Sequence, residues 1–370
     1  MLNSKSRRRS TALVALPLGL VSLAAPALAQ HYRETDLTSD QSGSASQLDP
    51  NLVNPWGLSR SSGGPWWISD NGTGLSTLYD GAGVAKSLVV SIPTGDANVS
   101  STGTPTGTVF NSGPGFAIAP GKPSLFLFVT EDGTISGWNP GVNPASAILT
   151  VNTKSASVFK GAAVATVTMP SGASSDFLYA ADFRKGRVQV YDSSFMHVAQ
   201  MEDAFKDEAL PDGYAPFNIQ NIGGDLYVTF AKQDGQKHDE VDGAGLGFVD
   251  VFTPSGRLVR RLEHGNWLNG PWALAMAPGD FGIYSHDLLV GQFGSGNIAV
   301  YDPATGRFKD LLRDSVNNPI AIQGLWGLSF GNGASSGPAT TLYFSAGVED
   351  EQHGLFGSIT PIENALGNSR

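Results

Sequence analysis

The stretch NPWGLSRSSGGPWWISDNGTGLSTLYD (residues 54–80) contains three short apolar runs separated by turn residues. The runs are too short for helices and are rich in Trp, Ile, Leu and Tyr, which favours β-strands. The glycine, proline, asparagine and aspartate between them are typical of tight turns. The stretch therefore predicts a small antiparallel meander, and its parts recur along the chain.

The pattern occurs six times, at intervals of 46 to 60 residues. Each copy opens with small or aromatic residues followed by apolar ones, at 55–58, 115–118, 161–164, 216–219, 271–274 and 325–328. A second β-rich run follows each opening, and a third run follows a glycine-bearing turn. Self-similarity at such a period is the signature of a repeat architecture.

A fourth run is visible in five copies, whereas the sixth copy stops after its third run. Residues 31–37 alternate in character and belong to no copy, so they would supply the missing strand. Six four-stranded antiparallel blades closed by the N-terminal strand describe an all-β, six-bladed β-propeller, with residues 30–370 as a single domain. A solenoid or a pair of β-sandwiches is the alternative. We expect a long loop at 93–113 and a short helix at 203–210.

The first 29 residues have the pattern of a cleaved secretory signal peptide, with a basic start, an apolar stretch and a small-x-small site at 27–29. Its removal takes away four positive charges and lowers the formal net charge from -10 to -14. So acidic a surface repels phosphate backbones and anionic lipid, which argues against nucleic acid and membranes as partners. We expect an exported monomer, periplasmic or extracellular, without cysteine chemistry and with a small molecule, polymer or protein as its partner.

Residues 178–191, LYAADFRKGRVQVY, resemble an NHL repeat, whose usual form is an L-Y-V-A-D step, a Gly or Asn turn and an R-V-x-V-F/Y run. Weaker versions lie at 51–80 and 271–301. As a whole, residues 31–362 are similar to an uncharacterised family of exported bacterial proteins of this type. The resemblance implies a propeller and no particular activity, since such folds serve both binding proteins and enzymes.

Acidic residues follow or end several of the second strands, namely Asp70, Glu131, Asp182 and Glu349, and Asp350 lies beside the last of them. Equivalent strand ends of a propeller lie on one face, so these carboxylates are candidate ligands for Ca²⁺ or another divalent cation. A resemblance to gluconolactonase-like and paraoxonase-like propellers implies an axial calcium, but their ligands match no particular positions here. The alternative is that each acid caps its own turn.

Two expanded turns, at 232–242 and 349–354, each place acids beside one histidine. His238, Asp239 and His353 are therefore the candidate catalytic residues, with an imidazole as general base or metal ligand and a carboxylate to orient it. The alternative is a pair of solvated loops. The G-x-S-x-G match at 327–331 belongs to a repeated strand with no helix after it, which argues against a nucleophile elbow.

Two functions follow from these residues. The first is an exported propeller that acts as a binding or scaffold protein for an unknown ligand, since no strong catalytic constellation is present. The alternative is a metal-dependent, calcium-type hydrolase of lactones or esters, with its site at the mouth of the central channel.

Overall fold

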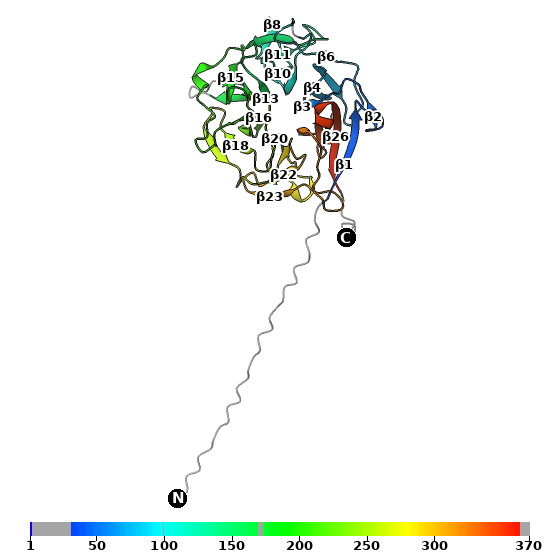
Figure 1. The fold of residues 1–370 in the computed structure, drawn as a ribbon, viewed down its shortest axis with the longest axis vertical. Coiled ribbons are helices and arrows are strands. Elements are labelled where there is room, and N and C mark those ends of the chain that lie inside the picture. The colour runs from blue at the N-terminus through cyan, green and yellow to red at the C-terminus, as the bar shows by residue number, and fades with distance from the viewer. Residues whose placement is uncertain (2–30, 99, 169–171, 173, 363–370) are drawn as a thin grey trace.

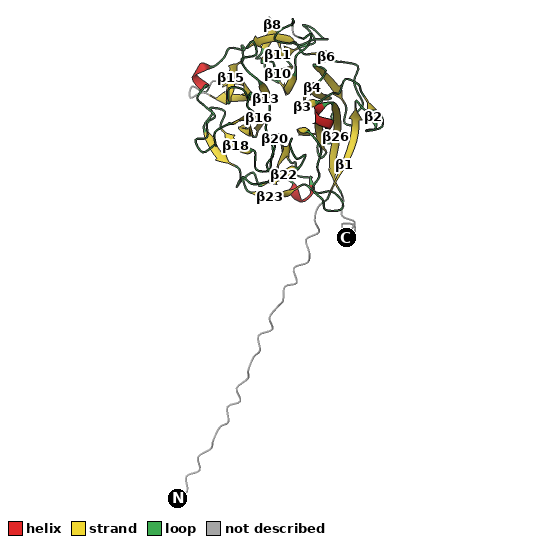
Figure 2. Ribbon diagram, viewed as in Figure 1, coloured by secondary structure: helices red, strands yellow, loops and turns green. Residues whose placement is uncertain are grey.

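The computed structural model describes residue 1 and residues 31–362, apart from 99, 169–171 and 173. Six β-sheets are arranged as blades around a central axis, and strands account for nearly all of the regular structure (Figures 1 and 2). The predicted all-β, six-bladed propeller is confirmed. The predicted signal peptide lies outside the described residues, apart from residue 1. No helix in the described part of the chain is long and apolar enough to cross a membrane.

Five of the blades are antiparallel sheets whose strands follow one another from the axis outward. Blade 6 has three such strands, and its two outer strands, at 32–39 and 47–48, come from the N-terminal part of the chain and pair with each other in parallel. Blades 1 and 2 contain β3 (Pro55–Arg60), β4 (Trp66–Asp70), β5 (Leu75–Tyr79) and β6 (Val90–Ser91), then β7 (Pro105–Phe110), β10 (Phe126–Thr130), β11 (Thr134–Trp138) and β12 (Ile148–Asn152). Blades 3 and 4 contain β13 (Phe159–Thr168), β14 (Ser174–Asp182) and β15 (Arg187–Asp192), then β16 (Tyr214–Ile222), β17 (Asp225–Lys232), β18 (Phe248–Phe252) and β19 (Leu258–Arg261).

Blades 5 and 6 complete the ring. They contain β20 (Pro271–Met276), β21 (Leu288–Gln292), β22 (Ile298–Tyr301) and β23 (Phe308–Leu311), then β24 (Leu325–Phe330), β25 (Leu342–Gly347), β26 (His353–Pro361), β1 (Tyr32–Ser39) and β2 (Gln47–Leu48). The remaining elements are β8 (Ala117–Ala119), β9 (Lys122–Pro123), the 3₁₀ helices η1 (Ala199–Met201) and η2 (Gly282–Tyr284), and the short α1 (Val348–Glu351).

Strand β1, from the start of the described chain, pairs antiparallel with β26 in blade 6 (Figure 1). Tyr32 in this strand is buried, and its hydroxyl donates a hydrogen bond of 2.9 Å to the carbonyl oxygen of Phe281 in blade 5. This is the place expected for residues 31–37. That the pairing is what holds the ring closed stays a prediction.

The opening of the second repeat was predicted at 115–118, and this prediction is wrong. The inner strand of blade 2 is β7 at 105–110, inside the stretch expected to be a loop, and residues 117–119 form β8 in a small separate sheet. A Cβ added to Gly107 would lie 2.7 Å from the backbone nitrogen of Ala162 in blade 3, so the neighbouring strands meet backbone to backbone here. That close approach favours a glycine-rich strand, whose composition is easily taken for a loop.

Two further expectations fail. Residues 203–210 form turns rather than a helix, and the nearby helical turn is η1 at 199–201. The Asp207 carboxylate accepts a hydrogen bond from the backbone N–H of Ala209, a local bond that competes with helix formation. Blade 3 has three strands rather than four, with a single bridge from Tyr191 to His197 where the fourth strand would begin.

Six aromatic side chains meet across the axis, four from inner strands and two from positions just after second strands. Trp56 and Trp326 stack with their ring centroids 3.4 Å apart, and Trp272 meets both rings edge-on. Around them pack the rings of Phe183, Phe217 and Phe293. We call these six residues the aromatic plug. Because the plug fills the middle of the channel, it separates two openings, one at each face of the ring.

Candidate functional site

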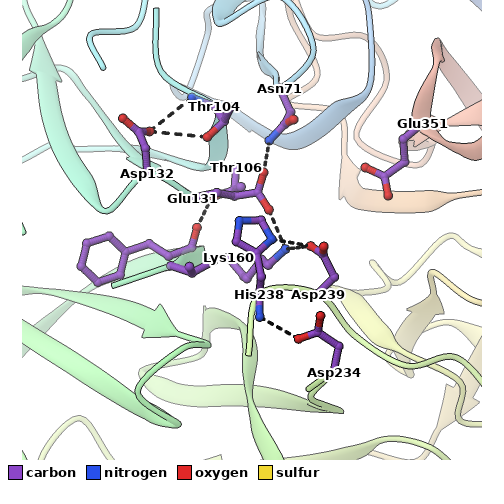
Figure 3. Close-up of polar contacts among 12 residues, drawn as sticks. Asn71, Thr104, Thr106, Glu131, Asp132, Lys160, Asp234, His238, Asp239 and Glu351 are labelled. Carbon is purple, nitrogen blue, oxygen red and sulfur yellow. Dashed lines mark hydrogen bonds and ion pairs between the residues drawn. The ribbon is translucent and has the colours of Figure 1, made fainter. Parts of the chain in front are cut away.

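One face of the propeller gathers carboxylates around the axis. Loops that join second strands to third strands carry them there from blades 2, 4 and 6, and Figure 3 shows several of their side chains converging. We call the group that surrounds this end of the channel the acidic opening; its members are Glu131, Asp239, Glu240, Asp242, Asp350 and Glu351.

Lys160 is the internal cation of the acidic opening. Its side chain is 1% exposed, and its ammonium group lies 2.6 Å from Glu131 Oε1 and 3.1 Å from Asp239 Oδ1 (Figure 3). The same ammonium lies 5.0 Å from the centre of the Trp56 ring, within cation–π range. Burial by itself would lower the pKa of Lys160, but Glu131, Glu240 and Asp239 outweigh it and raise the pKa, so the lysine is positively charged.

His238 and Asp239 form a pair at the rim of this cluster, with Nδ1 of the imidazole 2.8 Å from Asp239 Oδ1. That bond raises the pKa of His238 and lowers the pKa of Asp239. The pair is therefore inclined to the imidazolium–carboxylate form. An imidazole that already holds its proton is poorly suited to act as a general base near neutral pH.

A divalent cation does not fit the cluster as it stands. Glu131, His238 and Asp239 each offer a ligand atom, and these atoms lie within 4.8 Å of one another. However, the Lys160 ammonium contacts two of the three groups and supplies the positive charge that a metal ion would supply. A second cation here would face strong repulsion from a buried charge a few ångströms away.

The carboxylates are tied to the aromatic plug by side-chain hydrogen bonds. Asn54 accepts a bond of 3.1 Å from the indole N–H of Trp326 and donates one of 2.6 Å to Glu351. The indole N–H of Trp272 donates to the carbonyl oxygen of Lys160 at 3.0 Å. These bonds fix the position of the charged layer relative to the plug, so the acidic opening has a rigid floor.

The backbone at 349–351 is strained. Glu349, Asp350 and Glu351 all have positive φ, at 54°, 53° and 64°. This left-handed conformation costs roughly 1–2 kcal/mol for each residue that carries a Cβ. Consecutive strained residues persist only where the surroundings determine them, and they cluster at functional sites. Here the turn places Glu351 in the acidic opening (Figure 3). Its carboxylate accepts the bond from Asn54.

A cavity of about 330 Å³ opens beside this turn, among loops of blades 4, 5 and 6. Asp242 and Asp350 contribute carboxylates to its lining, and Phe293 contributes an aromatic ring that stacks on Trp326 at 4.0 Å. In the described part of the chain, neither carboxylate has an ion-pair or hydrogen-bond partner of its own. The cavity therefore combines two uncompensated negative charges with an aromatic wall.

The chain shares its sequence pattern with viral proteins. It is 34% identical over 336 residues to an uncharacterised protein of Acanthamoeba polyphaga mimivirus, covering 87% of this chain and 78% of that one. A second uncharacterised protein of the same virus is 32% identical over 332 residues, covering 87% and 84%. The chain belongs to this family. No protein-family profile matches it.

Among solved structures, a glucose dehydrogenase matches 88% of the chain and 99% of its own length, with a TM-score of 0.50 and 12% identity. At that identity the likeness shows the fold alone. The mimivirus relatives are uncharacterised proteins and indicate no activity, so function has to be inferred from the site. Kinship with exported bacterial proteins and export itself stay predictions.

The structure separates the predicted metal ligands into two groups. Glu131 and Asp350 lie in the acidic opening, and Glu349 lies beside Asp350 in the strained turn. Asp70 and Asp182 are instead fully buried within their blades. Asp70 accepts bonds from the backbone N–H and the hydroxyl of Thr77, and Asp182 accepts backbone N–H bonds from two residues and a bond from Gln189. For these two acids the turn-capping alternative describes the observed contacts.

The two predicted histidines do not meet. His238 lies in the cluster with Asp239, as predicted, but His353 pairs with Asp40 through a contact of 2.8 Å and lies 3.9 Å from Glu349. Sequence reasoning named the loops that carry Glu240, Asp242 and Glu351 without choosing those residues, and it missed Lys160 altogether. The signal for the lysine is a single cation directly before the small residues Gly161, Ala162 and Ala163, at the start of an inner strand.

Glu240 gives the acidic opening a pH dependence. Burial raises its pKa to about 8, and the attraction of Lys160 only partly offsets this. The folded state therefore keeps a proton that the unfolded chain has released, so the contribution to stability is complete below about pH 4.5 and is lost as the pH rises through about 8. We expect Glu240→Gln to reduce the fall in melting temperature between about pH 5.5 and 8.5 by roughly 2–5 °C.

The measurement is thermal unfolding of the wild type and the variant at both pH values. Glu34, whose pKa burial raises to about 7, is common to both proteins and cancels in the comparison. Equal falls for the two proteins would show that Glu240 does not titrate in this range.

Proposed function

We propose that this chain is an exported binding protein whose acidic opening holds a small organic cation, such as a diamine or a guanidinium-bearing amine. The observation that carries the proposal is the 330 Å³ cavity lined by the unpaired carboxylates of Asp242 and Asp350 and by the ring of Phe293. Its size lies within the range of small-molecule sites and far exceeds the space of one metal ion.

Three physical effects favour such a ligand. The carboxylates of Asp242 and Asp350 attract a protonated amine, whereas the neighbouring Glu240, whose pKa burial raises to about 8, is largely protonated near neutral pH and adds little to the negative field. An aromatic face stabilises an adjacent cation by about 0.5–2 kcal/mol, depending on its exposure to water. Phe293 is also held in place by Trp326, so little conformational freedom is lost when a ligand contacts it.

The alternative, a calcium-dependent hydrolase, has less support. Its predicted catalytic pair, His238 and Asp239, favours the protonated imidazole, and Lys160 already fills the place of a cation between Glu131 and Asp239. We therefore expect no calcium-dependent rise in melting temperature and no chelator-sensitive hydrolysis of lactones or esters. A ligand bound only by the folded state must raise the melting temperature by mass action. The melting temperature with and without Ca²⁺ is therefore a direct test of calcium binding.

The binding test is calorimetric titration of the full chain with agmatine and putrescine, with an uncharged diol of similar length as the ligand control. We expect the amines to bind and the diol not to bind. Asp242→Asn combined with Asp350→Asn should weaken amine binding at least about tenfold, or about 1.4 kcal/mol. Glu208→Gln, which removes an exposed carboxylate from another surface, is the matched control and should change nothing.

Two results would reject the proposal. One is equal affinity for the amines and the diol, and the other is unchanged amine binding in the double variant. Tight binding of Ca²⁺ that depends on Asp242 and Asp350 would instead assign the cavity to a metal.

A further inference from the structure

The opposite end of the channel holds a second cavity. Inner strands run from the acidic opening toward the other face, as from Pro55 to Arg60 in β3. Beyond the aromatic plug lies a small axial space lined by inner-strand residues of all six blades, including Gly57, Gly107 and Gly327. It adjoins a cavity of about 470 Å³ that shares Leu58, Thr108, Ala162 and Gln220 in its lining. We call this second cavity the Arg60 opening.

The lining of the Arg60 opening carries a positive charge, whereas that of the acidic opening is negative. The lining of the Arg60 opening contains no carboxylate, and Arg60 is its charged residue. The other polar side chains in the lining are those of Ser59, Thr108, Ser329, Gln220 and Asn221. The two ends of one channel therefore differ in sign, with carboxylates at one face and a guanidinium at the other.

Arg60 is held in place but not neutralised. Its Nε donates to the carbonyl oxygen of Phe330 at 2.6 Å, and its Nη2 donates to that of Gly331 at 3.1 Å. A guanidinium has five N–H donors, so three remain, and among the described residues none of them has a hydrogen-bond partner. No carboxylate of the described chain lies within ion-pair distance of Arg60.

Such a guanidinium is suited to an oxyanion. Burial lowers the pKa of Arg60, which reflects a partly desolvated positive charge, but a guanidinium stays protonated in proteins. Its fixed plane matches the two oxygens of a carboxylate or of a phosphate. Two backbone carbonyls orient the group before any ligand arrives, which reduces the entropy lost on binding.

We propose that the Arg60 opening binds a small hydroxylated oxyanion, a sugar carboxylate or a sugar phosphate. Arg60 takes the anionic group, and the surrounding hydroxyls and amides take the hydroxyl groups of the ligand. This site goes beyond the proposed binding of an organic cation and shares none of its residues with the cavity of Asp242 and Asp350.

The test is calorimetric titration of the full chain with glucuronate and glucose 6-phosphate, with glucose as the uncharged control. We expect one or both anions to bind about tenfold more tightly than glucose, or tighter still. The anion that binds better shows whether the site prefers a carboxylate or a phosphate. Arg60→Gln should lower the affinity for that anion at least about tenfold. The double variant at Asp242 and Asp350 should bind it as the wild type does, so the two proposals can fail separately.

Arg60→Gln also removes two hydrogen bonds to the end of strand β24 and could impair folding. A second variant is therefore needed to test binding independently of folding. Ser329→Asp places a carboxylate in the lining without touching those bonds, and it should lower anion affinity at least about tenfold while the far-ultraviolet circular dichroism spectrum stays unchanged. The proposal is overturned if neither anion binds at about 10 mM, if glucose binds equally well, or if folded Ser329→Asp keeps the wild-type affinity.

Discussion

Lys160→Met is expected to lower the free energy of unfolding by about 3–5 kcal/mol. The substitution keeps most of the apolar stem but removes the charge, which leaves Glu131, whose side chain is 11% exposed, without its ion-pair partner. A buried carboxylate that loses its partner costs far more than a surface ion pair contributes. The measurement is urea unfolding followed by tryptophan fluorescence, because Trp56 lies directly against the ammonium.

Two controls separate charge pairing from a general effect of losing a lysine. Lys206→Met removes an exposed lysine that pairs with Asp203 and should change stability by less than about 0.5 kcal/mol. Lys160→Met combined with Glu131→Gln should recover part of the loss, because the unpaired charge is then gone. A loss below about 1 kcal/mol for Lys160→Met, or no recovery in the double variant, contradicts the assigned role of the lysine.

Removing residues 31–39 is expected to abolish cooperative folding of the ring. The deletion strips β1 from β26, which exposes an unpaired strand edge, and it removes the buried contacts of Tyr32 with Phe281 and Tyr284 in blade 5. Free strand edges promote aggregation, so the shortened chain should also self-associate. The measurements are the width of the thermal transition and the mass in solution, compared with a chain that begins at residue 31.

Tyr32→Ala gives a graded version of the same test. It keeps the backbone pairing but removes a fully buried ring and its bond to Phe281, so a loss of about 3–5 kcal/mol is expected. Tyr214→Ala, which truncates a half-buried tyrosine in blade 4, should cost less. Wild-type stability of the shortened chain would mean that β1 does not hold the ring closed.

The fold could be predicted because each blade repeats the same local rules. Short β-rich runs and glycine turns identify a blade without knowledge of its neighbours, and a consistent repeat fixes the architecture. The prediction failed where a neighbouring blade decides the local structure. Residues 105–110 look like a loop, yet the contact of Gly107 with the backbone of blade 3 makes them an inner strand.

The site was only partly predictable, for a similar reason. The role of Lys160 depends on Glu131 and Asp239, which lie 29 and 79 residues away in other blades. Asp182 has the same local pattern as a ligand at a strand end, but a bond from Gln189 within its own blade keeps it inside. Nothing in the run of three acids at 349–351 indicates a left-handed turn, because tertiary contacts impose that conformation.

The acidic opening is proposed to hold an organic cation between Asp242, Asp350 and Phe293, and a crystal structure of the full chain soaked with agmatine tests this most directly. We expect density for the ligand in this cavity, with a charged end against the two carboxylates and Lys160 still paired with Glu131. An empty cavity with agmatine elsewhere, or a metal ion between Glu131, His238 and Asp239 with Lys160 displaced, would contradict the proposal.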